Sequence, residues 1–204
     1  MKGLIFAPQA NSKGRGDASY VFVPGAEAFA AYHGISNTVW LGASKNRSLV
    51  IDSIGAQSGL KVVAYFGHGL RSGLPSADLW WKDLPQLAEA VRSSCQLGAH
   101  VILYACTAGL PGCFANQLSK LVGPNVTVWG HTCQGHGYFN PYVTRYPFAA
   151  GDSAYVVDPE KDARWLKWVR LIKGSTLFWA RFPFLPQAAL RAEIDSGKSQ
   201  WIDI

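Results

Sequence analysis

The chain has 204 residues, of which 49% are hydrophobic and only 16% are charged. This composition favours a well-buried core over disorder, and the length is most simply that of one domain, residues 1–204. The net charge of +6 is spread along the chain, and no basic run carries interleaved aromatic residues. We therefore expect no nucleic-acid partner.

The cysteines and the first residues bear on the compartment. The apolar run that starts the chain stops at Pro8, which is too short for a signal peptide, and no stretch approaches the roughly 20 apolar residues that cross a bilayer. We expect no integral membrane segment and a reducing cytoplasm, although export by a signal-independent route would leave the same sequence. The cysteine spacing fits neither a disulfide-dense secreted scaffold nor a CxxC zinc pattern; the four are Cys95, Cys106, Cys113 and Cys133.

Strand and helix signals alternate along the first 130 residues. Apolar runs rich in Val, Ile and aromatic residues predict strands over 4–7, 37–41, 61–66, 101–104 and 126–129. Apolar positions at helical spacing predict helices over 25–33, 48–58, 83–97 and 114–122. Gly34 and Gly98 end the first and third of these helices. The alternation predicts an α/β fold of three layers, with a mostly parallel sheet between helices.

The character of the sequence changes after Gly130. Residues 131–147 are dense in Gly, His, Asn, Tyr and Pro and carry few helix or strand signals, which indicates a loop suited to forming pockets. We divide the domain into a core sheet over 1–150 and a Trp-rich helical extension over 151–204. Residues 162–173 read as a basic amphipathic helix, which either covers the core or lies on a membrane surface.

Two of the predicted strands end in residues that can carry chemistry. Strand 61–66 runs into Gly67, His68 and Gly69, and strand 101–104 runs into Ala105 and Cys106. The carboxyl ends of parallel strands are where ligands bind in open α/β sheets, so the two side chains can meet there as base and nucleophile. The backbone N–H groups of Gly69 and Cys106 can form an oxyanion hole, with glycine at 69 because a side chain would crowd the carbonyl under attack.

This ordered pair resembles the caspase-like (clan CD) cysteine peptidases. Members of that group carry an apolar strand that ends in His-Gly and a second that ends in Ala-Cys, as residues 62–69 and 101–109 do here. The resemblance covers about residues 60–130, and it implies a caspase-like fold and a cysteine endopeptidase that uses a dyad of Cys106 and His68. It implies no metal or organic cofactor, and a peptide or protein as the substrate.

The resemblance also implies where the substrate side chain before the cleaved bond, P1, is bound. In those families the loop after the first strand contributes charge to this pocket, and here the loop holds both Arg15 and Asp17. Asp17 favours a basic P1 residue, whereas Arg15 or Arg145 would favour an acidic one. Metacaspases place Asp two residues before the nucleophile, where this chain has Tyr104, and we expect Tyr104 to contact the substrate in its place.

Other catalytic residues, a metal site and other functions stay open as hypotheses. His131 and His136 are rival bases and Cys133 is a rival nucleophile, but they fall in the 131–147 loop, so we interpret them as wall or pocket residues, with His131 near the substrate. A metal site on these three lacks a fourth ligand. The same dyad suits an amidase or acyl transferase. A catalytically silent caspase-like module is the remaining alternative, and it would dock a partner through its Trp-rich tail, with Trp165, Trp168, Trp179 and Trp201. The oligomeric state is open.

Overall fold

The computed structural model describes residues 1–9, 22–44, 46–131, 143–147 and 155–156. Within them the main sheet has seven strands in the order β2-β1-β3-β6-β7-β8-β9, and a short hairpin, β4-β5, stands apart. The five strands from β2 to β7 are parallel to their neighbours, and β8 and β9 are antiparallel. The strands are β1 (Gly3–Pro8), β2 (Thr38–Leu41), β3 (Leu60–Phe66), β4 (Gly73–Leu74), β5 (Leu79–Trp80), β6 (Cys95–Tyr104), β7 (Val126–His131), β8 (Val143–Pro147) and β9 (Tyr155–Val156).

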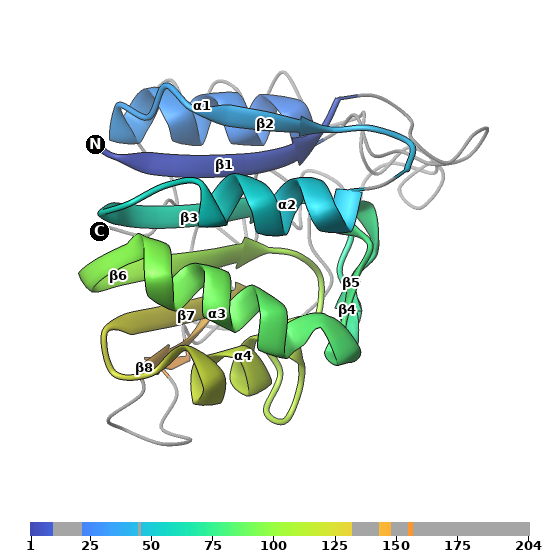
Figure 1. Ribbon diagram of the computed structural model, residues 1–204. Coiled ribbons are helices and arrows are strands. Elements are labelled where there is room, and N and C mark those ends of the chain that lie inside the picture. Colours follow the sequence, from blue (N-terminus) through green and yellow to red (C-terminus); the bar gives the residue numbers. More distant parts are fainter. Residues whose placement is uncertain (10–21, 45, 132–142, 148–154, 157–204) are drawn as a thin grey trace, which may run out of the picture.

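Helices cover both faces of the sheet (Figure 1). One face packs against α1, and the other packs against α2, α3 and α4, which lie side by side across it. The predicted three-layer α/β fold with a mostly parallel sheet is therefore confirmed. The helices are α1 (Val23–His33), α2 (Asn46–Gly55), α3 (Leu84–Ser94) and α4 (Phe114–Val122).

The carboxyl-terminal parts of the two central strands, residues 62–66 of β3 and 101–104 of β6, are apolar because both of their faces are buried. In β3, Val63 and Tyr65 contribute to the core under α2, α3 and α4, while Ala64 and Phe66 contribute to the core under α1. Alternate residues of a strand point to opposite faces, so a strand with two covered faces shows no polar alternation. This is why the sequence predicted β3 and the end of β6 correctly.

The sequence placed the junction of α3 and β6 incorrectly. The helix ends at Ser94, not at 97, and the strand begins at Cys95. Gly98 has a positive φ of 78° and donates its N–H to the Asn125 carbonyl, so it bends the strand and does not cap the helix. The error is physical in origin, because the helical spacing of α3 runs without interruption into residues that pair with β3. Gly34, by contrast, has a φ of 62° at the C-cap of α1, as predicted.

Two strand regions carried no clear sequence signal. The hairpin β4-β5 lies in a loop rich in Gly, Pro and Ser, and each of its strands is only two residues long. Strand β8 lies in the segment that we predicted as a loop, and it extends the sheet beyond β7. Strand β9 continues the sheet past residue 150; the rest of the predicted C-terminal extension, with its tryptophans, lies outside the described residues.

No helix in the part of the chain that the structure describes has the length and apolar character needed to cross a bilayer.

Candidate active site

The ends of β3 and β6 lie side by side. These two strands are neighbours in the sheet and parallel, and their register pairs Phe66 with Tyr104. Just beyond this pair, the N–H of Gly67 donates to the Tyr104 carbonyl at 3.3 Å. His68 and Cys106 therefore leave the sheet at the same level, each two positions after the last paired residue of its strand.

A close backbone contact brings the two exits together. A Cβ atom added at Gly69 would lie 2.5 Å from the Cys106 carbonyl oxygen and 2.6 Å from the Ala105 Cβ. The chain at Gly69 thus runs directly against the peptide that carries Cys106, and only glycine fits there. This is a different reason for the glycine from the one the sequence suggested, since the side chain would collide with Cys106 itself before it met a substrate.

The turn that presents Cys106 is strained and tightly braced. Thr107, the next residue, has a φ of 57°, a left-handed conformation that β-branched residues rarely adopt. Two residues further on, the Gly109 N–H donates to the His131 carbonyl at 2.8 Å, and a Cβ at Gly109 would collide with the carbonyl oxygen of Gly130. Strand β7 therefore fixes the β6 exit through contacts between main chains.

The thiol of Cys106 differs from the other two cysteines that the structure describes. Cys106 is half-buried and forms no disulfide, whereas Cys113 is buried. Burial raises the pKa of the Cys95 thiol to about 11, so that thiol stays protonated near neutral pH. Of the three, Cys106 is the one at the carboxyl edge of the sheet, where the sequence placed the nucleophile. Cys133 lies outside the described residues.

His68 is half-buried and held from both sides of the sheet. On the α1 side, its ring stands edge-on to Phe22 with ring centroids 5.2 Å apart. On the other side its main chain is held by two hydroxyl groups: its N–H donates to Ser76 Oγ at 3.2 Å, and its carbonyl accepts from Tyr65 Oη at 2.9 Å. Neither Tyr65 nor Ser76 carried a signal in the sequence that pointed to this contact.

Tyr104 and His131 form the wall beneath this edge. Tyr104 is 2% exposed and stacks on Phe66 at 4.4 Å, and His131, 4% exposed, stands edge-on to the Tyr104 ring at 5.2 Å. Burial lowers the pKa of His131 to about 3, so its imidazole is neutral at pH 7. The sequence suggested that both residues contact substrate; in the structure both rings are buried and pack beneath this edge of the sheet.

Of the three charged residues suggested for specificity, the structure describes the backbone of Arg145 alone. Asp17 and Arg15 are outside the described residues, as are His136 and Cys133. Arg145 lies on β8, where its backbone pairs with Trp129 and Tyr155. Within the described ranges, no three His, Cys, Asp or Glu side chains gather in a way that could hold a metal ion.

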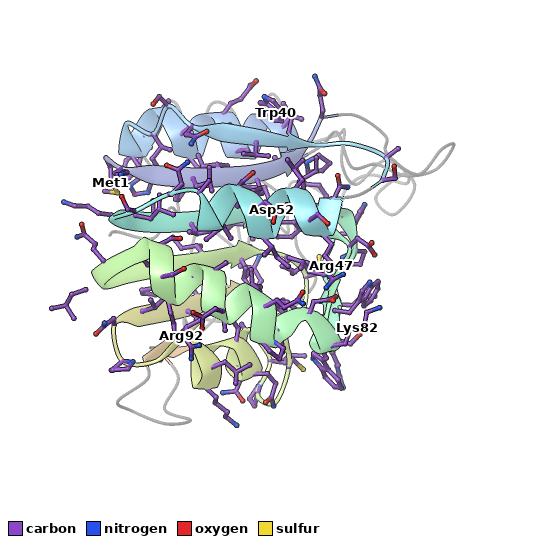
Figure 2. The ribbon with its side chains drawn as sticks, in the orientation of Figure 1. Met1, Trp40, Arg47, Asp52, Lys82 and Arg92 are labelled. Atoms are coloured by element: carbon purple, nitrogen blue, oxygen red, sulfur yellow. The ribbon has the colours of Figure 1, made fainter. Side chains whose placement is uncertain are left out.

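An ion pair that the sequence did not indicate lies at the same end of the molecule. Arg47 of α2 places its Nε 2.8 Å from Oδ1 of Asp83, just before α3. The other carboxylate oxygen of Asp83 accepts the N–H of Trp80 at 2.9 Å. Figure 2 shows Arg47 and Lys82 beside the β4-β5 hairpin, so the hairpin is anchored to the helical layer here.

Comparisons with known proteins give a distant structural similarity. No family model matches the sequence, and no curated protein matches it. Among solved structures, the chain is similar to the crystal structure of gingipain R, described as an Arg-specific cysteine proteinase. The TM-score is 0.44 and the sequence identity is 18%, over 68% of this chain and 33% of the gingipain chain. The chain thus spans about a third of the length of that protein.

Proposed function

We propose that this protein is a caspase-like cysteine endopeptidase in which Cys106 is the nucleophile and His68 is the general acid and base. The observation that carries the proposal is the contact of Gly69 with the Ala105–Cys106 peptide. It joins the residue after the histidine to the cysteine, at the carboxyl ends of adjacent parallel strands. A nucleophile and a base that leave such strands at the same level can come within the hydrogen-bond reach that covalent catalysis requires, and this backbone proximity supports the proposal.

The chemistry follows from these two groups. The Cys106 thiol gives its proton to the His68 imidazole, and the sulfur attacks the peptide carbonyl carbon. The N–H groups of Gly69 and Cys106 stabilise the oxyanion that forms. When the carbon–nitrogen bond breaks, His68 returns the proton to the leaving amine. A water molecule, deprotonated by His68, then hydrolyses the thioester and regenerates the thiol. The proposal requires no metal or organic cofactor.

The substrate is a peptide or protein, and the charged residues near the P1 side chain set which P1 residue is preferred. Asp17 would accept a basic side chain, and Arg15 or Arg145 would accept an acidic one; we propose the basic preference. The buried positions of Tyr104 and His131 leave these charged residues as the candidates for contact with P1. A thiol nucleophile also has to stay reduced, which agrees with a cytoplasmic location.

The decisive experiment compares the full chain with its Cys106→Ala variant on an unbiased peptide library, with cleavage sites read by mass spectrometry. We expect cleavage by the wild type and none by the variant, because the alanine has no nucleophile. Cys95→Ala is the matched control and should retain cleavage, since Cys95 lies at the start of β6. Equal cleavage by wild type and Cys106→Ala would rule the proposal out.

The alternatives predict other results. An amidase or acyl transferase with the same dyad would leave all peptides intact while Cys106 reacted with alkylating agents at a rate that depends on His68. A silent binding module would show neither cleavage nor any effect of His68 on the thiol.

A further inference from the structure

The main chain of His68 is held by two buried hydroxyl groups. Tyr65, three residues earlier on β3, donates from Oη to the His68 carbonyl at 2.9 Å. Ser76, from the loop between β4 and β5, accepts the His68 N–H on its Oγ at 3.2 Å. Both polar groups of the half-buried His68 backbone are thus bound by side chains, outside the hydrogen-bond pairing of the sheet.

This arrangement continues away from the site through Asn46. The Asn46 side chain donates to the Ser76 carbonyl at 2.9 Å and to the Gly42 carbonyl at 2.7 Å. It also accepts the Gly42 N–H at 3.0 Å. Tyr65, Ser76 and Asn46 are 3%, 2% and 5% exposed. A buried polar group without partners is costly, and a satisfied network of such groups is rigid, so this chain of contacts fixes Ser76 in place.

Gly67 shows how closely Tyr65 is fitted. A Cβ at Gly67 would collide with Tyr65 Oη, and it would lie 2.6 Å from Tyr65 Cζ and 3.2 Å from Ser76 Cβ. The tyrosine ring therefore folds back over Gly67 to reach the His68 carbonyl. The two glycines that flank His68 serve two different contacts: Gly67 makes room for Tyr65, and Gly69 makes room for Cys106.

The phenol of Tyr65 stays a hydrogen-bond donor at any pH the protein meets. Burial raises its pKa well above the ordinary value, and the hydrogen bonds with Ser76 offset only part of that effect. A negative charge on Cys106 would raise it further. When Cys106 forms a thiolate, the Tyr65 phenol therefore stays protonated and can still donate its hydrogen bond.

We propose that Tyr65 and Ser76 are positioning residues for His68: by binding its carbonyl and its N–H, they fix the backbone from which the imidazole reaches Cys106. This inference rests on the proposed function, because it assigns to these residues the task of keeping the dyad in register. With both backbone groups bound, the imidazole is left with only its own side-chain torsions to vary.

The test measures how the reactivity of Cys106 depends on pH, and it needs no knowledge of the substrate. The full chain is treated with iodoacetamide at pH 6 and pH 9, and the rate of Cys106 alkylation is followed by peptide mass spectrometry. A thiol paired with an imidazolium stays partly ionised at pH 6, whereas an isolated thiol is mostly protonated there. The ratio of the two rates therefore reports the pairing and is insensitive to a uniform change in access.

The variants are His68→Ala, Tyr65→Phe and Ser76→Ala, with Ser119→Ala as the control. Ser119 is buried like Ser76, and its Oγ donates one hydrogen bond, to the Asn116 carbonyl at 2.7 Å on α4. His68→Ala should lower the pH 6 to pH 9 ratio by about tenfold or more, since the thiolate loses its partner. Tyr65→Phe and Ser76→Ala should each lower it by about two- to fivefold. Ser119→Ala should leave it unchanged.

The outcomes separate the two proposals. If His68→Ala lowers the ratio while Tyr65→Phe and Ser76→Ala match the wild type, the positioning role is wrong and the dyad stands. If His68→Ala has no effect, the dyad is wrong and the positioning role falls with it. Circular dichroism shows which variants are folded. If only one of Tyr65→Phe and Ser76→Ala folds, that variant is enough for the test, because each removes one of the two contacts with the His68 backbone. The inference would also be overturned if Ser119→Ala lowered the pH 6 to pH 9 ratio as much as Tyr65→Phe and Ser76→Ala do.

Discussion

The two strand exits that form the site are held in different ways. The β3 exit is held by side chains, since the Tyr65 and Ser76 hydroxyls bind the backbone of His68. The β6 exit is held by main chain against main chain, at the close approach of Gly109 and Gly130 and in the hydrogen bond from Gly109 to the His131 carbonyl. The position of Cys106 thus depends on Gly109 and Gly130, which have no side chains and let the main chains touch. The position of His68 depends on the side chains of Tyr65 and Ser76.

This difference predicts how each exit responds to substitution. A contact between main chains leaves no room for an added atom, so change at the β6 exit should cost fold stability. A hydroxyl can be removed with little change in volume, so change at the β3 exit should alter the histidine while the fold remains. The three predictions below probe the β6 exit, in order of expected effect.

Gly109→Ala should produce the largest loss of stability. The added Cβ would collide with the Gly130 carbonyl oxygen, and because that atom belongs to a central strand it cannot move aside. We expect the free energy of unfolding to fall by about 3 kcal/mol or more, measured from the urea midpoint.

Gly55→Ala is the matched control for this substitution. Gly55 is the last residue of α2, and a Cβ there would meet nothing within 4 Å. It should be neutral or stabilise the protein by about 0.5 kcal/mol. If Gly109→Ala were as stable as Gly55→Ala, the β6 exit would not be held by its main chain, and the contrast between the two exits would fail.

The sequence predicted the parts of this site that depend on strand pattern. The apolar runs of β3 and β6 are long enough to identify, so the two residues that follow them, His68 and Cys106, could be placed at one edge. The register that sets them level, Phe66 beside Tyr104, depends on three-dimensional pairing and could not be predicted.

The residues that hold the site gave weaker signals. In the sequence, Ser76 is one polar residue among others in a loop of Gly, Pro and Ser. It accepts the His68 N–H only because the β4-β5 hairpin folds back over the end of β3. Tyr65 reads as an ordinary aromatic strand residue. Gly109 and Gly130 are 21 positions apart in the sequence, and nothing local shows that they touch. Tyr104 was expected to contact the substrate because it lies two residues before Cys106, yet its ring stacks on Phe66 in the core.

Acid should weaken the β6 exit through His131. The pKa of this buried imidazole is lowered to about 3, from an ordinary value of 6.5, because burial disfavours the charged form. Its Nε2 has no hydrogen-bond partner among the described residues. Between pH 6.5 and 3 the unfolded chain therefore binds a proton that the folded chain does not, so stability present above pH 6.5 is lost as the pH falls. The loss should approach about 1 kcal/mol per pH unit.

The measurement is a series of urea unfolding curves from pH 7 to pH 4 on the wild type and on His131→Gln. The variant should be less stable at pH 7, because glutamine does not fill the space against Tyr104, but its stability should fall less steeply with acid. Parallel curves for the two proteins would show that His131 does not set the acid sensitivity.

Thr107→Gly should give the smallest effect of the three substitutions at the β6 exit, and the effect should be a gain in stability. A threonine at a φ of 57° is strained, and glycine adopts that conformation freely, although it adds entropy to the unfolded chain. We expect the free energy of unfolding, measured from the urea midpoint, to rise by up to about 1 kcal/mol. We also expect slower alkylation of Cys106. Asp78→Gly is the control, because Asp78 has a φ of 51° away from this turn and aspartate tolerates it. If both variants gain equally, the strain at Thr107 has no special part in presenting the thiol.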